Sequence, residues 1–542
     1  MSDSDLTDRP PRRDPPRRTD ASAEPERADA RPLLIVAPTV HLDTQWRWTV
    51  QETIGEFLPR TLSENFALFR RHPDYVLGFE GAFRYMLTEE YYPQAFEELV
   101  EWCRRRRWRP AGGMLDAPDV NVVAPESLIR HILYGNGYFA ERLGERCRDL
   151  FLPDCFGFGW ALPSVAAHCG LESISTSKLI KWKSPDEIPL DVGRWRGPDG
   201  AEIVAVLQPG GYGEGLDENL ARSDDWRRRL EATGSQCGVA VGVRYMGVGD
   251  RGGAPDAESI ARLEESLETE GAIDVRCAPA AEILDHLTPQ ARRRLPLHDD
   301  EILLPTHGTG CWTSQAALKR WNRRNELLAG AAERAAVIAD WLGGMPYPDR
   351  RLELGWRQFL WHQMHDDLTG TSIPAAYRFT WNDEAVAANL FAGVLTDAVG
   401  VVADALDTRT KGLPLVVYNP LGCRRRDIVE IALPASMLPA EHLAVLDPDD
   451  ARLPLQIEPL GRTDERAAAH PSGGRGRRVR LLFPAAVGAL SFSVFRLVDE
   501  REAGESRWEP EPLSVGARAL ENHRFRVGID DTGELTSIVD RR

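Results

Sequence analysis

The chain has 542 residues, with 83 Asp plus Glu against 66 Lys plus Arg, which gives a formal net charge of −17. This length is well beyond one typical domain and predicts a multidomain protein with large hydrophobic cores. The negative charge argues against nucleic acid and an anionic membrane as main partners, and it favours a neutral or cationic ligand.

Residues 1–31 are rich in Pro, Arg and Asp and carry almost no large apolar side chains, which predicts a disordered tail. The tail has no apolar h-region, and no later stretch approaches the roughly 18 uninterrupted apolar residues of a membrane span. The eight cysteines are scattered without a C-x-x-C pair, which indicates reduced thiols. We therefore expect a cytoplasmic protein without a secretion signal or a spanning helix.

From residue 32 to 310, short apolar runs such as LLIVAP and EIVAVLQ alternate with helix-like segments. Such alternation is typical of β/α units around a mainly parallel sheet, and we expect a barrel-like α/β catalytic domain. In these folds, ligands bind at the carboxyl ends of the strands. The residues that follow each strand are therefore the first candidates for a functional site.

Two predicted strands end in ionisable residues. LLIVAPTV leads into His41 and Asp43, and DLFLPD ends in Asp154. Burying such groups unpaired is costly, so a partner is expected at these strand ends. One histidine and two aspartates can supply three ligands to a zinc ion, and His365, near the end of a predicted helix, is a candidate for the fourth place.

Residues 311–410 form three long helical stretches with short breaks, which predicts an antiparallel three-helix bundle. Residues 411–542 change to period-two runs with turn signals, such as LPLVVYN and RVRLLFPA, which predict β-strands of a partial β-sandwich. The last run, before Arg542, shows no sign of closing a sandwich. We therefore expect this β-rich domain to be incomplete.

Three motifs, HLDTQWRW, FLPDCFGFGWALP and HDDLTGTS, stand in the order found in the α-mannosidases of glycoside hydrolase family 38. The resemblance also takes in DAPDVNVVAPESLIRHILYGNGYF and THGTGCWTSQAALKRWNRRNE, and it runs from about residue 36 to 380, with a weaker match beyond. It implies a metal-dependent retaining α-mannosidase. Such an enzyme removes terminal α-linked mannose from oligosaccharides or glycoconjugates through a covalent glycosyl-aspartate.

The resemblance also implies roles for individual residues. One Zn²⁺ per chain, or another divalent metal, would be held by His41, Asp43, Asp154 and His365. Asp154 would also be the nucleophile, which a bound cation keeps ionised. Asp250, in MGVGDRGGAP, would be the acid/base, although Arg251 replaces a glycine of the family's loop and brings a positive charge. The candidate substrate-binding side chains are Trp46 and Trp312, whose indole faces can stack on sugars, together with Phe156, Asp366, Asp116 and Asp119. Asp116 and Asp119 could equally be turn residues.

Other interpretations stay open. A truncated, inactive protein would still bind zinc and sugar, and a different metal-dependent carbohydrate hydrolase, such as a deacetylase, would not need Asp250. The G-x-G-x-x-G at Gly247, Gly249 and Gly252 matches the dinucleotide fingerprint but lies deep inside the α/β region. His362, where the family usually has Asn, is expected to form hydrogen bonds rather than to bind metal. The linkage cleaved and the oligomeric state, a homo-oligomer included, are left open.

Overall fold

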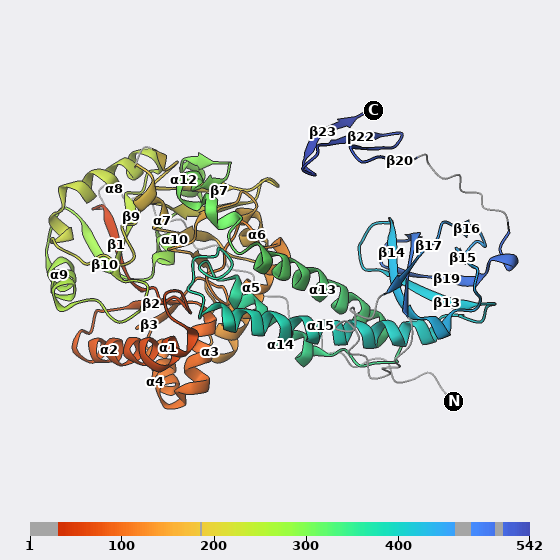
Figure 1. Ribbon diagram of the computed structural model, residues 1–542. Helices are drawn as coiled ribbons and strands as arrows, with labels where there is room; N and C mark the ends of the chain where they lie inside the picture. The colour runs from red at the N-terminus through yellow and green to blue at the C-terminus, as the bar shows by residue number, and fades with distance from the viewer. Residues whose placement is uncertain (1–30, 185–186, 461–477, 505–512) are drawn as a thin grey trace, which may run out of the picture.

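The computed structural model describes residues 31–184, 187–460, 478–504 and 513–542. Residues 1–30, nearly the whole of the predicted disordered tail, lie outside the described residues. Figure 1 shows an α/β part, three long helices beside it, and several β-sheets toward the C-terminus. The predicted mixed class, with a parallel sheet first and antiparallel strands later, is confirmed.

The first sheet has five strands and is built around β1 (Leu33–Val40), in which all eight residues are buried. β1 pairs in parallel with β9 (Val241–Val248), β10 (Asp274–Cys277) and β2 (Leu77–Glu80), and β2 pairs in parallel with β3 (Trp108–Ala111). In a parallel sheet the connecting helices cover both faces, so a central strand is shielded from water on both sides of the sheet, which explains the uninterrupted apolar run.

A second five-stranded sheet follows the first. Its strands, in spatial order, are β11 (Leu297–His298), β7 (Val192–Arg196), β8 (Glu202–Val206), β6 (Ser173–Ser175) and β4 (Asp149–Phe151). The Gly113 N–H donates to the Asp149 carbonyl at 2.9 Å, and the Tyr245 N–H donates to the Pro209 carbonyl at 2.7 Å. These bonds join β3 to β4 and β9 to the segment after β8, so the two sheets contact each other at two places.

Helices surround these strands (Figure 1). The longer ones are α2 (Leu58–Arg71), α3 (Ala82–Tyr91), α4 (Pro93–Arg104), α5 (Pro125–Arg142), α8 (Asp224–Cys237) and α9 (Ala257–Glu268). The shorter ones include α6 (Leu162–His168), α7 (Lys178–Trp182), α10 (Ile283–His286), α11 (Pro289–Arg294) and α12 (Pro305–Gly308). α5 begins with Pro125 in its first turn, and its Ile129 and Leu133 are exposed.

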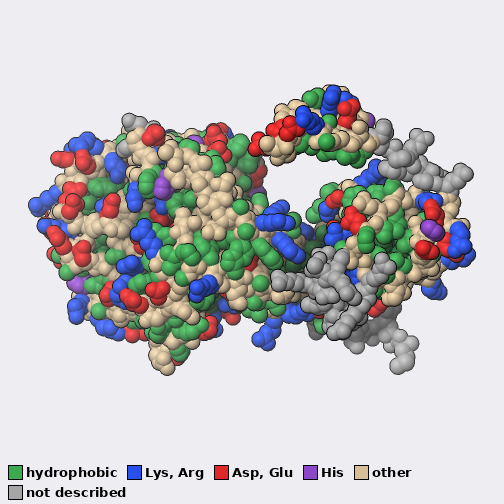
Figure 2. Space-filling model, viewed as in Figure 1, with side chains coloured by type: hydrophobic (Ala, Val, Ile, Leu, Met, Phe, Trp, Pro, Cys, Tyr) green, Lys and Arg blue, Asp and Glu red, His purple; other side chains and the backbone are tan. Residues whose placement is uncertain are grey.

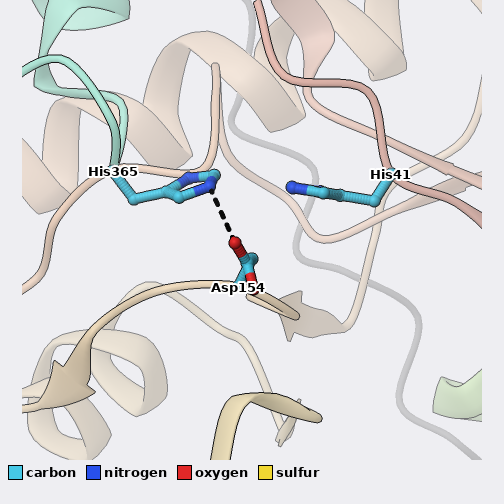
Figure 3. A group of neighbouring side chains, drawn as sticks. All are labelled: His41, Asp154 and His365. Atoms are coloured by element: carbon cyan, nitrogen blue, oxygen red, sulfur yellow. Dashed lines mark ion pairs between the residues drawn. The ribbon is translucent and has the colours of Figure 1, made fainter. Parts of the chain in front are cut away.

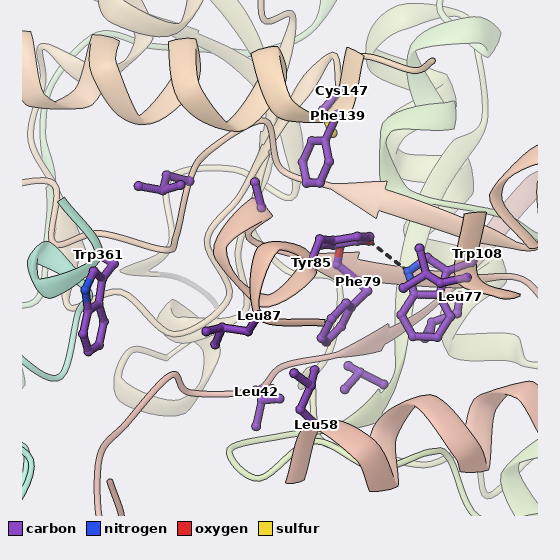
Figure 4. Packing of buried hydrophobic residues seen from close by; sticks show 14 of the residues in the cluster. Leu42, Leu58, Leu77, Phe79, Tyr85, Leu87, Trp108, Phe139, Cys147 and Trp361 are labelled. Carbon is purple, nitrogen blue, oxygen red and sulfur yellow. Dashed lines mark hydrogen bonds between the residues drawn. The ribbon is translucent and has the colours of Figure 1, made fainter. Parts of the chain in front are cut away.

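Aromatic side chains fill the core between β2, β3 and the helices (Figure 4). Trp108 is fully buried, and its Nε1–H donates to the Tyr85 hydroxyl at 2.9 Å. That hydroxyl in turn donates to the Phe79 carbonyl at 3.0 Å. Since both polar tips have partners, these rings bury their apolar surface without leaving an unsatisfied group.

The three predicted helices are α13 (Ala316–Trp341), α14 (Asp349–Leu360) and α15 (Tyr377–Ala405). The Asn325 amide donates to the Glu384 carbonyl at 3.0 Å, and the Phe391 ring lies 5.9 Å from that of Trp356, so α15 packs on both α13 and α14. In the described ranges α15 is the one helix long and apolar enough to cross a membrane by length and composition. A helix packed in the core of a protein passes the same test, so this helix is weak evidence of a membrane span.

The C-terminal strands confirm the predicted period-two runs. A four-stranded sheet contains β13 (Leu413–Asn419), β19 (Ser491–Asp499), β15 (Leu443–Leu446) and β16 (Arg452–Leu453). A three-stranded sheet contains β14 (Arg425–Pro434), β18 (Arg478–Val487) and β17 (Gln456–Leu460). A third sheet has β20 (Ser514–Val515), β21 (Ala519–Glu521), β22 (Phe525–Ile529) and β23 (Leu535–Asp540). Leu415 and Phe495, in the sheet of β13 and β19, share a buried cluster with Phe483, in the sheet of β14 and β18.

Acidic and basic side chains are mixed on the face of the α/β part in Figure 2, without a large patch of one sign. The arginine-rich run at 104–109 begins at the end of α4 and continues into β3. There Arg105 pairs with Glu101 at 2.8 Å, and Arg109 pairs with Glu145. Local carboxylates thus neutralise part of this run, as expected for a solvated helix end.

Candidate active site

His41 and Asp43 directly follow β1, and backbone hydrogen bonds fix their position. The His41 N–H donates to the Val248 carbonyl at 3.0 Å, and the Asp43 N–H donates to the Asp250 carbonyl at 2.9 Å. Both acceptors lie at the end of β9 or in the loop after it. The parallel pairing of β1 with β9 therefore brings the two strand ends together at one place.

Four predicted metal-binding side chains converge at these strand ends. His41 Nε2 lies 3.0 Å and His365 Nε2 3.2 Å from the same Asp43 Oδ1. His365 Nε2 also lies 3.8 Å from Asp154 Oδ2, and Figure 3 shows His41, Asp154 and His365 directed toward one another. One ligand atom from each of these three residues lies within 4.8 Å of the other two.

His365 reaches the site from a different kind of segment than predicted. We expected it near the end of the second bundle helix, but α14 ends at Leu360 and a short 3₁₀ turn follows. The chain then pairs with residues 117–119, where the His365 N–H donates to the Ala117 carbonyl at 3.1 Å and the Asp119 N–H donates to the Gln363 carbonyl at 2.7 Å. This pairing replaces helical hydrogen bonds and brings His365 beside β1.

Both imidazoles use Nδ1 for a hydrogen bond within the protein. His41 Nδ1–H donates to Glu80 Oε1, and His365 Nδ1–H donates to the Ala117 carbonyl at 3.1 Å. In each ring Nε2 then faces the cluster as the free nitrogen. A carboxylate or carbonyl on the outer nitrogen is the usual arrangement for a metal-binding histidine.

The donor set fits a divalent cation. His41 Nε2, Asp43 Oδ1 and His365 Nε2 are buried and lack a hydrogen-bond partner. Burial alone would lower the pKa of His365, but the neighbouring carboxylates of Asp43 and Asp366 raise it to about 9. The carboxylates thus stabilise positive charge here, and a metal ion on two histidines and two aspartates would supply it in place of imidazole protons.

Asp154 has a second, cationic partner. Lys178, at the start of α7, is 7% exposed, and its Nζ donates to Asp154 Oδ1 at 2.7 Å. The same ammonium lies 4.2 Å from the centre of the Phe156 ring, which is 6.2 Å from the His365 ring. One oxygen of Asp154 therefore faces Lys178, while the other faces His365.

Asp250 lies in the loop after β9 in a left-handed conformation, with φ of 59°. Its Oδ1 accepts a hydrogen bond of 3.0 Å from the Tyr212 hydroxyl, and the Tyr212 ring meets His41 edge-on at 4.8 Å. Tyr212 thus links the predicted acid/base to the metal-binding cluster. The Arg251 guanidinium lies over the rings of Trp48 and Phe57, at 5.5 and 5.9 Å.

The glycines around Asp250 have packing roles. A Cβ on Gly247 would lie 1.9 Å from the Thr39 carbonyl oxygen, because β9 and β1 pair closely there. Gly252 has φ of 63°, and a Cβ on it would lie 2.4 Å from Thr61 Oγ1. These contacts account for two of the three glycines in the dinucleotide-like motif without a nucleotide.

Three predicted substrate-binding carboxylates lie close to the cluster and differ in their hydrogen-bond partners. Asp116 is fully buried, accepting from Arg84 Nη1 at 2.8 Å and from Thr44 Oγ1 at 2.6 Å. Asp119 Oδ1 accepts two backbone N–H bonds of its own loop, while its Oδ2 is buried without a partner. Burial and the charge of Asp43 raise the pKa of Asp366 to about 7. Asp119 therefore keeps one oxygen for a ligand, whereas Asp116 has protein partners on both oxygens.

The predicted tryptophans are held by nearby segments. The Trp46 carbonyl accepts from the Ile373 N–H at 2.8 Å, and the Arg47 guanidinium lies 4.3 Å from its ring. Trp312 ends a short 3₁₀ turn and is 38% exposed. His362 has the expected hydrogen-bonding role, since its two nitrogens lie 2.8 Å from Asp367 Oδ2 and 3.3 Å from Asp383 Oδ2.

Four further residues of the site, Glu80, Lys178, Tyr212 and Arg84, were not predicted from the sequence. Glu80 ends β2, and Lys178 follows β6 by three residues. The strand-end rule that found His41 and Asp154 would have found both if it had been applied to every strand. Tyr212 and Arg84 carry no comparable signal, because Tyr212 lies in a glycine-rich loop and Arg84 on a helix.

Comparison with known proteins matches this chain to domains of glycoside hydrolases. Residues 33–301 match the N-terminal domain of glycosyl hydrolases family 38, and residues 307–400 match the alpha mannosidase middle domain. The chain therefore belongs to glycoside hydrolase family 38, as its motifs predicted.

Individual relatives agree with this assignment. The chain is 30% identical over 340 residues to alpha-mannosidase G of Dictyostelium discoideum and 27% identical over 337 residues to human alpha-mannosidase 2C1. These matches cover 62% and 61% of this chain but only 30% and 31% of the relatives. A solved alpha-mannosidase from Enterococcus faecalis V583 shares the fold, with a TM-score of 0.69 and 17% identity over 94% of this chain and 61% of that one. The chain thus spans about a third of the curated relatives it matches.

Proposed function

We propose that this chain is a metal-dependent retaining α-mannosidase that removes terminal α-linked mannose from oligosaccharides or glycoconjugates. The observation that carries the proposal is the convergence of His41, Asp43, Asp154 and His365. Buried atoms of His41, Asp43 and His365 lack a hydrogen-bond partner, and one ligand atom each of His41, Asp154 and His365 lies within 4.8 Å of the other two. Membership of family 38 supports the substrate class. We further propose one Zn²⁺ per chain and a cytoplasmic location, the latter supported by eight cysteines without a disulfide.

The proposed metal site fits the chemistry of a glycosidase. A bound Zn²⁺ would supply positive charge next to the sugar hydroxyls, which favours ring distortion and an oxocarbenium-like transition state. Glu80 and the Ala117 carbonyl hold the two imidazoles in orientation through their Nδ1 atoms. Asp119 Oδ2 is buried without a hydrogen-bond partner and could accept from a further hydroxyl.

Asp154 would attack the anomeric carbon while the bond from that carbon to the leaving oxygen breaks. Asp250, oriented by Tyr212, would give its proton to the departing oxygen. In the second half, Asp250 would take a proton from a water molecule, whose oxygen attacks the anomeric carbon and releases Asp154. Lys178 holds one oxygen of Asp154, so the carboxylate is oriented before attack.

Trapping of the glycosyl-enzyme tests this proposal. A 2-deoxy-2-fluoro-α-mannosyl fluoride slows the second step more than the first, so an adduct should accumulate on the peptide that contains Asp154. Mass spectrometry of the digested, zinc-loaded chain should find one sugar on that peptide. An adduct on another residue would overturn the nucleophile assignment. Hydrolysis without any adduct, or release of acetate from an acetylated sugar, would favour a different carbohydrate hydrolase.

A further inference from the structure

An exposed aromatic pair lies outside the metal-binding cluster. The indole of Trp182, at the end of α7, stacks on the imidazole of His307, in α12, with ring centres 3.5 Å apart and an interplanar angle of 12°. Trp182 is 44% exposed, whereas Trp195 in the same α/β part is fully buried. The stacking therefore holds a large apolar ring at the surface instead of in the core.

A short series of rings connects this pair to the candidate active site. The His307 ring lies 5.5 Å from the Phe156 ring, and Phe156 lies 6.2 Å from His365. α7 also carries Lys178 at its other end, hydrogen-bonded to Asp154. The same short helix thus contacts the proposed nucleophile at its start and presents an exposed indole one turn later.

His307 adds a polar group to this surface. Its Nε2 is buried at the pair and lacks a hydrogen-bond partner. Burial, together with the charge of Lys178, lowers the pKa of His307, so the ring is neutral at neutral pH. A neutral imidazole stacks as an aromatic ring and keeps one nitrogen for a hydroxyl group. The exposed Lys181 ammonium, 5.5 Å from the Trp182 ring, adds a hydrogen-bond donor.

We infer that Trp182 and His307 bind the leaving group of the substrate, in the form of a second pyranose ring. The inference rests on the proposed function and names the side chains that determine which leaving group the enzyme accepts. An indole face packs on the apolar C–H face of a sugar, while hydroxyls at the ring edge reach polar partners such as His307 Nε2. Phe156 and Lys178 separate this surface from His365, so the pair borders the site without touching the reacting carbon.

Two substrates separate a leaving-group role from a role in the chemistry. A mannobioside carries the second ring, and α-mannosyl fluoride has no ring beyond the mannose. Trp182→Ala should lower kcat/KM for the mannobioside by about 10- to 100-fold and change kcat/KM for the fluoride by less than about 2-fold. His307→Ala should show the same selectivity. Trp341→Ala, which removes an 83%-exposed indole at the end of α13, is the matched control and should change neither substrate.

Equal losses on both substrates, or no loss on either, would overturn the inference. Failure of the proposed function gives a different pattern, in which the unmodified zinc-loaded chain hydrolyses neither substrate. In that case calorimetry decides: Trp182→Ala should weaken binding of the mannobioside and leave binding of mannose unchanged. Equal affinities of the variant and the unmodified chain for the mannobioside would then reject the role of Trp182.

Discussion

Asp116→Ala should destabilise the α/β part and loosen the metal site, because Asp116 belongs to a buried ion pair. Its Oδ1 lies 2.8 Å from Arg84 Nη1, and neither side chain has any exposed surface. The other oxygen accepts from Thr44, one residue after Asp43. The substitution leaves the Arg84 guanidinium buried without its counter-charge.

The size of the effect follows from this geometry. Removing one partner of a buried ion pair typically costs about 3 to 5 kcal/mol. Arg84 Nε also donates to the Leu42 carbonyl, and Leu42 lies between His41 and Asp43. A displaced guanidinium therefore shifts the segment that carries two of the proposed metal ligands, and zinc affinity should fall by about 10- to 100-fold.

Urea unfolding of the zinc-loaded chain measures the first effect, and competition with a chromophoric chelator measures the second. With a slope of about 3 kcal/mol per molar urea, the midpoint should fall by about 1 M or more. Glu101→Gln, which breaks the exposed pair with Arg105, is the control and should leave the midpoint unchanged. An Asp116→Ala chain with normal stability and zinc affinity, but a raised KM for mannosides, would refute this account and make Asp116 a substrate-binding residue.

Three further predictions concern other residues. Lys178→Met should lower kcat by about 10- to 100-fold with one zinc still bound, because Asp154 Oδ1 loses its partner; loss of the zinc would contradict this. Burial raises the pKa of Asp149 to about 6, so the folded chain retains a proton that the unfolded chain releases near pH 4. The free energy of unfolding should therefore fall by up to about 3 kcal/mol as the pH rises from 4 to 6. Asp149→Asn should remove that part of the pH dependence of stability. An unfolding free energy that varies with pH as in the unmodified chain would reject this role of Asp149. Gly247→Ala should lower the thermal midpoint, since its Cβ would meet the Thr39 carbonyl at 1.9 Å, and a normal midpoint would contradict the strand-packing role.

The sequence predicted those parts of the site that local patterns encode. His41 and Asp43 stand directly after an uninterrupted apolar run, so the strand-end rule locates them from the order of residues alone. Asp154 is found in the same way. Nothing in the local sequence connects His365 to them, since it lies more than 200 residues after Asp154. It was a candidate for the fourth ligand, and the resemblance to family 38 supported that choice.

Other features depend on tertiary contacts that cannot be derived from the hydrophobic periodicity of the sequence. The helical pattern continued through HQMHD, yet α14 ends at Leu360 because the next residues pair with residues 117–119. Asp116 could be read from sequence as a turn residue or a hydroxyl binder, because its partner Arg84 lies on a separate helix. The stacking of Trp182 on His307 likewise joins segments 125 residues apart in the chain.

Turnover of an aryl α-mannoside by the zinc-loaded chain, before and after chelation, tests the central claim most directly. The account predicts that release of the aryl group stops when the metal is removed and returns when Zn²⁺ is added. Asp154→Asn should stay inactive under all three conditions. Undiminished turnover after complete removal of the metal, or activity in the Asp154→Asn chain, would contradict the account.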